Sequence, residues 1–344
     1  MAAATGERYS GLDILKSICA FLIVSIHAPF PGEAGMYFMS LTRMAVPVFF
    51  MITGFFYDGV RRRGRVNAQI MKVFRLFLSA NILYFGWGLA NAAADGRVGA
   101  FVSENFGFRK LLRFVFLNEA LFSSHLWYLG ALLYVLVIKA ALDKWFPQTS
   151  DKILYALTPV LLLGDLLLGK YSMVVFGRAF PHVLVRNFLF VGVPYFSIGC
   201  YLYEKRDRIS IRRERNILLI ILFAGTTLLE RYLLVRSGLN PPRDHYISST
   251  FLAAAAFILF LNSGRDQPRA TLLEKIGREY SAFIFIIHPL LLQIMEKAVG
   301  LSGSVAVAEV YTAVRPVAIY AASILLAEIY YIIKKKTDGH VSGK

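Results

Sequence analysis

The sequence predicts an all-α integral membrane protein, a bundle of about ten transmembrane helices. Hydrophobic residues make up 57% of its 344 residues, the mean hydropathy is +0.55, and many separate apolar runs reach the ~20 residues that a helix needs to cross a bilayer. The net charge of +16 would also suit a nucleic-acid-binding protein. However, Lys and Arg cluster in short segments between the apolar runs, as loops facing anionic lipid require. We therefore expect contact with membrane lipid and no nucleic-acid partner.

Charged or Gly/Pro-rich segments separate ten apolar stretches, which we expect to be the helices. In chain order they are 12–29, 37–57, 70–92, 124–142, 153–168, 187–203, 216–235, 249–263, 280–297 and 312–333. The segment 106–122 is apolar too, but Arg109, Arg113 and Glu119 are among the polar residues that interrupt it. We expect an interfacial or re-entrant piece there, with an eleventh span as the alternative.

The basic residues predict the orientation of these helices. With ten spans and the N-terminus inside, the basic clusters at 61–75 and 205–215 face the cytoplasm. About twice as many Lys and Arg residues then lie inside as outside, which is the bias that sets topology. Both termini are cytoplasmic in this arrangement. We interpret residues 1–336 as one membrane domain and residues 337–344 as a short cytoplasmic tail.

The sequence gives little sign of metal or covalent chemistry. Only Cys19 and Cys200 occur, both within predicted spans, so neither a disulfide framework nor a cysteine metal site is indicated. No cluster of His, Asp and Glu has the spacing of metal ligands, and the chain lacks a Gly-x-Ser-x-Gly motif or a glycine-rich phosphate loop. We expect no metal and no permanently bound cofactor.

Lys16 and His27 form the most informative pair. They are eleven positions apart in the first apolar stretch, so a helix places both side chains on one face, roughly 16 Å apart along its axis. A neutral imidazole in a protected site can take a proton from an incoming hydroxyl, which makes His27 our candidate general base. The alternatives are a histidine bonded to a neighbouring helix for packing and a lysine whose stem carries its ammonium to the interface.

Arg43 is the third candidate. It lies several residues inside the second stretch, four residues before Pro47. A guanidinium keeps its charge, so at that depth it must meet an anion, carbonyl groups or water. Arg43 therefore predicts a polar cavity; the alternative is a contact with lipid phosphate at the interface. Pro47 loosens the helix, and Thr53-Gly54 permits close approach of a neighbouring helix.

This pattern resembles the membrane-bound acyltransferase family 3, whose first helix carries an Arg or Lys, ten residues and then a His. Here these are Lys16 and His27. The second helix is similar in Arg43, which is followed by a Val-Pro, an aromatic pair and Thr53-Gly54-Phe55. Two features depart from the family pattern: Lys16 replaces the commoner Arg, and Thr53 the commoner Ser. A lysine, as a point charge, cannot grip a phosphate bidentately, so the departure at Lys16 bears on its role.

The resemblance extends to two later helices. The segment from His125 to Leu129 reads His-Leu-Trp-Tyr-Leu, and Ile286 to Pro289 reads Ile-Ile-His-Pro. The likeness therefore runs from Leu12 to about Tyr331. It implies an acyltransferase-3-like membrane domain over residues 1–336.

The function implied by the resemblance is transfer of an acyl group, usually acetyl from cytoplasmic acetyl-CoA as donor substrate, to a hydroxyl of a cell-envelope glycan or related acceptor at the inner membrane. Because the donor is a polyanion, Lys72 and Arg75 are candidate contacts for its phosphates. Such basic loops also occur simply because they obey the topology rule. Lys16 would lie along the route of the thioester to His27 as a phosphate or carbonyl contact.

Glu230 is a further candidate, near the end of the 216–235 stretch that we place outside. Its carboxylate could orient His27, hold an acceptor hydroxyl or neutralise Arg43. The alternative is a solvated rim residue.

His125, Trp127 and His288 are candidate substrate contacts. His125 and Trp127 lie at a helix end, where an interfacial aromatic belt is the alternative. His288 lies deeper and precedes Pro289. Its alternative role is to satisfy a backbone carbonyl that the proline kink sets free.

The reading that joins these residues is a ten-helix inner-membrane O-acyltransferase. His27 deprotonates the acceptor hydroxyl, while Arg43 and Lys16 position the donor or stabilise developing negative charge. Direct transfer is the simpler mechanism, and an acyl-histidine intermediate is the alternative. The rival function is a transporter or flippase-like module for a small polar or lipid-linked substrate. Some relatives carry this module fused to a serine or alanine racemase, and we expect no such domain after Lys344. The sequence leaves open the acceptor, the acyl group and the oligomeric state, a homo-oligomer included.

Overall fold

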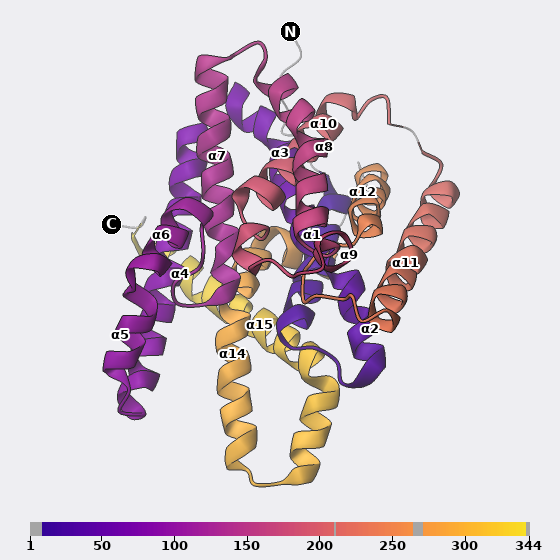
Figure 1. The fold of residues 1–344 in the computed structure, drawn as a ribbon. Helices are drawn as coiled ribbons and strands as arrows, with labels where there is room; N and C mark the ends of the chain where they lie inside the picture. The colour runs from indigo at the N-terminus through magenta and orange to yellow at the C-terminus, as the bar shows by residue number, and fades with distance from the viewer. Residues whose placement is uncertain (1–8, 210, 264–270, 342–344) are drawn as a thin grey trace. The chain divides into compact units, whose positions relative to one another are not determined.

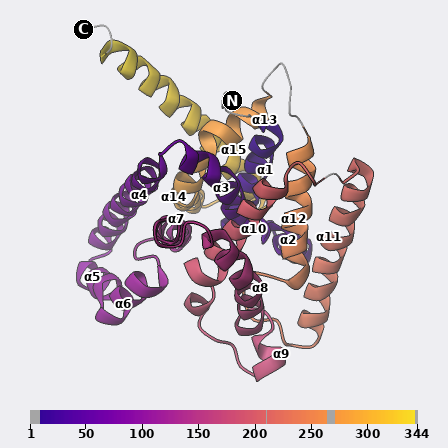
Figure 2. The same cartoon turned by 90° about the horizontal axis from the view of Figure 1, so that it is seen from above.

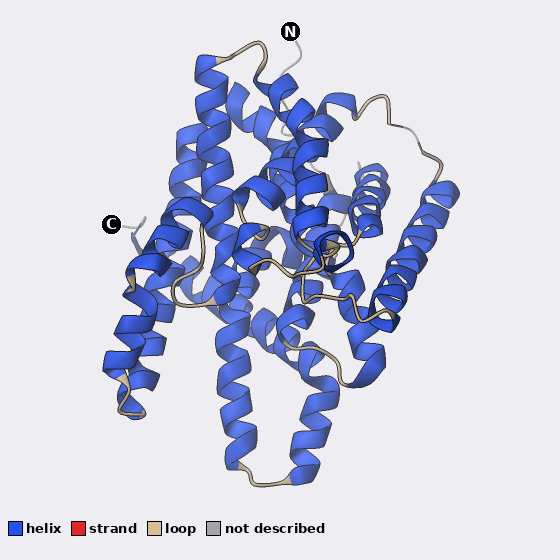
Figure 3. Cartoon of the chain, viewed as in Figure 1, coloured by secondary structure: helices blue, strands red, loops and turns tan. Residues whose placement is uncertain are grey.

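The computed structural model describes residues 9–209, 211–263 and 271–341. Helices make up nearly all of this part of the chain, and none of the described residues lies in a strand (Figure 3). The all-α prediction is therefore confirmed. The chain divides into two compact units: unit 1 comprises Met1–Val48, Ser210–Arg231 and Ser248–Lys344, and unit 2 comprises Phe49–Ile209 and Tyr232–Ile247.

Unit 1 is built around its first helix. Its helices are α1 (Ser10–His27), α2 (Gly32–Thr42), α13 (Leu272–Lys275), the π-helical turn η4 (Ile276–Tyr280), α14 (Ser281–Leu301), α15 (Val305–Val341), most of α11 (Arg213–Arg236) and nearly all of α12 (Ile247–Asn262). Helix α1 contacts α2, α13, η4, α14 and α15. Helices α14 and α15 form an antiparallel hairpin (Figure 1).

Two glycines let the backbones in unit 1 approach α1 closely. A Cβ atom on Gly11 of α1 would lie 1.9 Å from the carbonyl oxygen of Phe260 in α12. A Cβ atom on Gly277 of η4 would lie 1.7 Å from the carbonyl oxygen of Asp13. Small residues at such crossings are how membrane helices gain packing contacts, since lipid supplies no hydrophobic drive between them. These contacts fix α1, and with it His27, inside unit 1.

The stretch 37–57, which we expected to be one helix, is interrupted. Helix α2 ends at Thr42 and α3 (Ala45–Arg62) begins three residues later, with Arg43 in the turn between them. Pro47 explains the position of the break, because it has no N–H to donate to the carbonyl of Arg43 and fits best in the first turn of a helix. The two helices together still form one candidate span of 31 residues, Gly32–Arg62.

Unit 2 contains most of α3 and the middle of the chain. Its helices are α4 (Val66–Ala94), α5 (Val98–Phe106), α6 (Phe108–Leu117), η1 (Ser124–Leu126), α7 (Trp127–Trp145), α8 (Ser150–Leu168), α9 (Ser172–Phe176), η2 (His182–Leu184), the π-helical η3 (Phe188–Gly192) and α10 (Val193–Lys205). Helix α10 packs on α8, and α7 packs on α4 and η3.

The close approach predicted at Thr53-Gly54 is confirmed in unit 2. A Cβ atom on Gly54 of α3 would lie 2.0 Å from the carbonyl oxygen of Phe196 in α10. In the opposite direction, a Cβ atom on Gly199 of α10 would lie 2.0 Å from the carbonyl oxygen of Met51. The Sγ atom of Cys200 also donates to the carbonyl of Gly54 across this contact, at 3.4 Å.

Segment 106–122 folds into a short helix and a turn. Helix α6 has 10 residues, too few to cross a bilayer, and it contacts the neighbouring α5, which in turn contacts α4 (Figure 2). Asn118 ends α6 with a left-handed φ of 48°. Its side chain donates to the carbonyl of Trp127 and accepts the N–H of Phe188, so the turn is pinned to two other elements. The expectation of an interfacial or re-entrant piece fits this short helix better than an eleventh span does.

Each of the ten predicted stretches is helical over most of its length, but fewer qualify as membrane spans. Within the described residues, seven helices are long and apolar enough to cross a membrane. The other three predicted spans correspond to α8, to α10 with 13 residues and to α12 with 16. The structure supports a multi-pass membrane protein, and by this criterion the count is seven instead of about ten.

Candidate active site

The ring of His27 lies beside the ring of His288 in unit 1. Their centroids are 5.1 Å apart and the ring planes are inclined by 52°. His27 is the last residue of α1 and is half-buried, while His288 lies within α14 and has no exposed surface. The structure therefore brings together two histidines that are 261 positions apart in the sequence. His27 faces protein on this side, as an ionisable residue in a membrane helix should.

The contact of His288 with its own helix fixes the positions of its ring hydrogens. Its Nδ1 lies 2.9 Å from the carbonyl oxygen of Ile284. A carbonyl oxygen only accepts hydrogen bonds, so Nδ1 carries the hydrogen. The alternative role of His288 was to satisfy a carbonyl freed by Pro289, which is that of Phe285; the contact in the structure is with the preceding carbonyl, that of Ile284.

Lys16 forms an ion pair that the sequence interpretation missed. Its Nζ lies 2.9 Å from Oδ1 of Asp13, one turn earlier on α1. Both side chains are mostly buried, with 21% and 12% of their surfaces exposed. The spacing of three residues is the signal that could have revealed the pair, because residues i and i+3 are neighbours on a helix.

Arg315 holds the chain that leaves the end of α1. One guanidinium nitrogen donates to the carbonyl oxygen of Pro29 at 3.0 Å, and another lies 3.3 Å from Oε1 of Glu296. Arg315 is on α15 and Glu296 on α14, so this hairpin holds Arg315 in place while it binds the backbone two residues beyond His27. This contact restrains the end of the helix that carries the candidate base.

Arg43 and Glu230 both belong to unit 1 but lie in different elements. Arg43 is half-buried in the turn between α2 and α3. Glu230 of α11 accepts hydrogen bonds from the backbone N–H and the hydroxyl of Ser248, at the start of α12. A carboxylate there satisfies an N–H of the first turn and complements the helix dipole. These contacts give Glu230 a helix-capping function.

His125 and Trp127 are buried inside unit 2. The Nδ1 atom of His125 lies 2.8 Å from the hydroxyl of Ser123, and its ring packs 5.0 Å from that of Tyr84. Trp127 is 8% exposed, and the guanidinium of Arg186 lies 5.6 Å from its ring. The alternative of an interfacial aromatic belt is wrong for Trp127, because a belt residue would face lipid.

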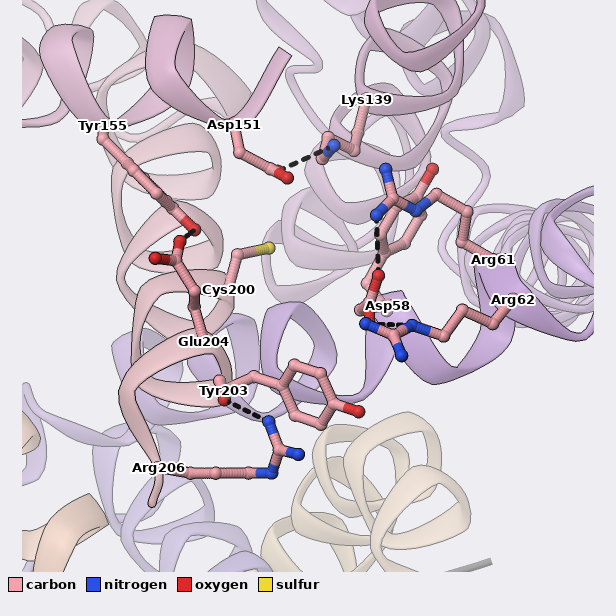
Figure 4. Close-up of a pocket in the computed structure, with 11 residues that line it drawn as sticks. Asp58, Arg61, Arg62, Lys139, Asp151, Tyr155, Cys200, Tyr203, Glu204 and Arg206 are labelled. Atoms are coloured by element: carbon pink, nitrogen blue, oxygen red, sulfur yellow. Dashed lines mark hydrogen bonds and ion pairs between the residues drawn. The ribbon is translucent and has the colours of Figure 1, made fainter. Parts of the chain in front are cut away.

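Unit 2 also contains a polar cavity of about 360 Å³ (Figure 4). It opens among the ends of α3, α7, α8 and α10. Its lining combines four cations, three carboxylates, three tyrosines and one cysteine: Arg61, Arg62, Lys139, Arg206, Asp58, Asp151, Glu204, Tyr57, Tyr155, Tyr203 and Cys200.

The charges of the cavity form a network of ion pairs. Arg61 and Arg62 both pair with the carboxylate of Asp58, each at 2.7 Å, and Arg61 also lies 3.6 Å from Asp143. Lys139 is 2.9 Å from Asp151 and also pairs with Asp143 behind the cavity. A hydrogen bond from Lys205 holds the pKa of Glu204 below its ordinary value, so this carboxylate is ionised at neutral pH.

Lys72 and Arg75 are not among the residues that line this cavity. Both lie on α4 with exposed side chains. The two arginines of α3, a few residues earlier in the same basic cluster, are the ones that reach the cavity.

Comparison with known proteins agrees with the sequence motifs. A family model described as an acyltransferase domain matches residues 9–331. The chain belongs to acyltransferase family 3. The suspected family is thereby confirmed, and with it the coarser reading of the chain as a membrane acyltransferase.

Curated relatives of this family member include longer proteins. An amino-acid racemase of Enterococcus faecalis is 25% identical over 84% of this chain and 42% of its own length. A serine/alanine racemase of Enterococcus gallinarum is 25% identical over 82% of the chain and 40% of its own length. The chain thus spans about two fifths of these relatives. No solved structure matches it significantly.

Within this acyltransferase, the structure joins only some of the predicted residues. It places His27 against His288 and holds both Lys16 and Arg43 in unit 1. His125, Trp127, Lys72 and Arg75 belong to unit 2. The sequence interpretation did not include Asp13, although its spacing from Lys16 was a signal, nor Arg315, whose contacts are apparent only in the folded chain. It predicted a polar cavity at Arg43, but Arg43 is not among the residues that line the cavity of unit 2.

Proposed function

We propose that this chain is a membrane O-acyltransferase that moves an acyl group, acetyl by preference, from cytoplasmic acyl-CoA to a hydroxyl of a cell-envelope glycan or related acceptor. The observation that carries the proposal is the half-buried imidazole of His27 at the end of α1, against a second imidazole, in a member of an acyltransferase family. An imidazole suits proton transfer near neutral pH better than any other side chain.

In the proposed reaction, His27 accepts the proton of the acceptor hydroxyl as the oxygen attacks the thioester carbonyl carbon. The carbon–sulfur bond then breaks, the ester forms, and the thiolate of CoA leaves with the proton that His27 returns. Arg43, whose charge is permanent, stabilises the negative charge that develops on the carbonyl oxygen. Lys16, held by Asp13, contacts the donor. No covalent enzyme intermediate is needed.

We assign the donor phosphates to the cavity of unit 2. Arg61 and Arg62 present two guanidinium groups to the cavity, where both pair with Asp58 and Arg61 also lies 3.6 Å from Asp143. Guanidinium groups bind phosphates strongly because they present two parallel donors. Arg61, Arg62 and Arg206, which line the cavity, follow the predicted cytoplasmic ends of two spans, the side on which acyl-CoA occurs. Both termini are cytoplasmic in this proposal.

We do not propose a racemase activity for this chain on the basis of its relatives' names. The chain matches less than half of those proteins, and an activity named for a whole protein can reside in the part that is not shared. The transporter reading predicts substrate movement across proteoliposomes without any dependence on CoA.

The direct test uses the full chain purified into lipid nanodiscs with radiolabelled acetyl-CoA. The proposal predicts release or transfer of the labelled acetyl group by the wild type and a loss of at least about 100-fold in His27→Gln. The matched control is His245→Gln, which alters a buried histidine of unit 2. Equal turnover by the wild type and His27→Gln would refute the role of His27, and an inert wild type would refute the choice of donor.

A further inference from the structure

Two walls of the cavity in unit 2 present different chemical groups to its interior (Figure 4). The end of α3 forms one wall, where Arg61 and Arg62 project guanidinium groups that donate hydrogen bonds. Helices α8 and α10 form the opposite wall, which carries the carboxylates of Asp151 and Glu204. We call these the donor wall and the acceptor wall, because ionised carboxylates only accept hydrogen bonds.

The donor wall keeps donors for a ligand in spite of its ion pairs. Both arginines contact Asp58, which belongs to the same helix. A guanidinium group has five N–H donors, however, and the side chains of Arg61 and Arg62 are 37% and 74% exposed. A phosphate group that enters the cavity can therefore reach these N–H groups.

The acceptor wall is open in the same way. Lys139 contacts Oδ1 of Asp151, and 39% of the Asp151 side chain is exposed. Glu204 accepts from the hydroxyl of Tyr155 at 3.2 Å and from Lys205, and 49% of its side chain is exposed. A carboxylate has about four acceptor positions, so these contacts leave both groups able to bind an N–H of a ligand.

A ligand that satisfies both walls needs negative charge at one end and N–H donors at the other. Inorganic phosphate compounds meet only the first need, and the carboxylates of the acceptor wall repel them. An adenine nucleotide meets both, because its phosphates accept from guanidinium groups and its exocyclic amine donates to carboxylates. The cavity, at about 360 Å³, is within the range of roughly 300–1,000 Å³ that small-molecule sites occupy.

We propose that the cavity binds the adenosine 3′,5′-bisphosphate end of the acyl-CoA donor, with phosphates at Arg61 and Arg62 and the exocyclic amine of adenine at Asp151 and Glu204. This inference rests on the proposed function, which assigns the donor phosphates to this cavity, and adds the base and its orientation. The carboxylates then select a nucleotide against other phosphate compounds, since they penalise any ligand that brings no N–H donor to them.

A pair of ligands that differ only in the amine tests the proposal. Adenosine 3′,5′-bisphosphate has the exocyclic amine, and purine riboside 3′,5′-bisphosphate lacks it. We expect the adenosine compound to bind the full chain in nanodiscs about tenfold or more tightly, because the other ligand leaves the desolvated carboxylates without a hydrogen bond. Inorganic pyrophosphate should bind more weakly than the adenosine compound. Isothermal titration calorimetry measures the three dissociation constants.

The double variant Asp151→Ala/Glu204→Ala removes the acceptor wall. We expect its affinities for the two nucleosides' bisphosphates to agree within twofold. The ratio of the two constants is the readout, because the loss of two negative charges changes the affinity for both ligands alike. The control is Asp95→Ala/Glu104→Ala, which removes two exposed carboxylates that do not line the cavity and should keep the wild-type ratio.

Equal binding of the two bisphosphates by the wild type, binding of neither, or an unchanged ratio in Asp151→Ala/Glu204→Ala would overturn the inference. The wild-type ratio alone decides the matter if a variant does not fold. A wild type that prefers the adenosine compound but transfers no acetyl group would refute the proposed function and leave the nucleotide site standing. Acetyl transfer without that preference would refute the nucleotide site alone, so the two failures are distinguishable.

Discussion

The ammonium of Lys16 and the carboxylate of Asp13 form an ion pair of 2.9 Å along one face of α1. The pair lies about three helical turns below His27. The carboxylate of Asp13 compensates the charge of Lys16 inside the membrane helix, which lowers the free-energy cost of burying the ammonium group. This explains how a lysine can lie mostly buried at position 16.

Removing one partner of this pair should destabilise the protein more than removing both. We expect Asp13→Asn to lower the free energy of unfolding by about 1–3 kcal/mol, because it leaves the Lys16 ammonium mostly buried without its carboxylate. The double variant Asp13→Asn/Lys16→Met should recover part of that loss. Thermal unfolding of the single and double variants measures the coupling. Strictly additive losses would show that the two side chains do not interact energetically.

The crossing of η4 over α1 should tolerate no side chain at position 277. In Gly277→Ala the new methyl group would meet the backbone oxygen of Asp13 at 1.7 Å, so one backbone has to move. We expect a loss of about 3 kcal/mol in unfolding free energy. Gly300→Ala on α14 is the control, because its methyl group meets nothing within 4 Å. A Gly277→Ala variant as stable as Gly300→Ala would contradict this packing.

Arg315 should affect catalysis through the backbone beyond α1. Arg315→Met removes the hydrogen bond to the Pro29 carbonyl, so we expect faster hydrogen exchange at the end of α1 and a kcat about tenfold lower. Glu296→Gln should leave both nearly unchanged, because the contact with Pro29 remains. Exchange measured by mass spectrometry, alongside turnover, checks both effects. Equal exchange rates and equal kcat in the two variants would show that the contact between Arg315 and Pro29 does not restrain α1.

The cavity assignment makes a prediction about the donor. Arg61→Gln/Arg62→Gln should raise KM for acetyl-CoA about tenfold or more with a smaller change in kcat, because phosphate contacts contribute to ground-state binding. Lys72→Gln/Arg75→Gln removes the same number of charges from the exposed face of α4 and should change KM less than twofold. A larger rise in KM in Lys72→Gln/Arg75→Gln than in Arg61→Gln/Arg62→Gln would indicate that Lys72 and Arg75 bind the donor instead.

Much of the fold could be predicted because apolar length is a strong signal in a membrane chain. The segment from Leu12 to Pro29, for example, closely anticipates α1. The break at Arg43 could not be placed in the same way. Pro47 indicated that the backbone hydrogen bonds of the helix are weakened there. Whether the helix then kinks or ends depends on the residues that pack around it.

The candidate site was harder to predict than the fold. His27 and His288 could each be singled out as intramembrane histidines, but their pairing is a tertiary contact between α1 and α14. Glu230 illustrates the opposite case: its charge suggested chemistry, and the structure gives it a capping contact with Ser248. Which carboxylates cap helices and which face a site depends on neighbours that are distant in sequence.

The central claim, that His27 is the base of an acyl transfer to an envelope acceptor, is tested most directly by mass spectrometry of envelope glycans. The cells compared should produce equal amounts of the wild type or of His27→Gln in the membrane, with cells lacking the chain as the baseline. The account predicts an acyl mass increment on a glycan or lipid-linked sugar with the wild type and its absence with His27→Gln. The same increment in both, or in neither, would contradict it.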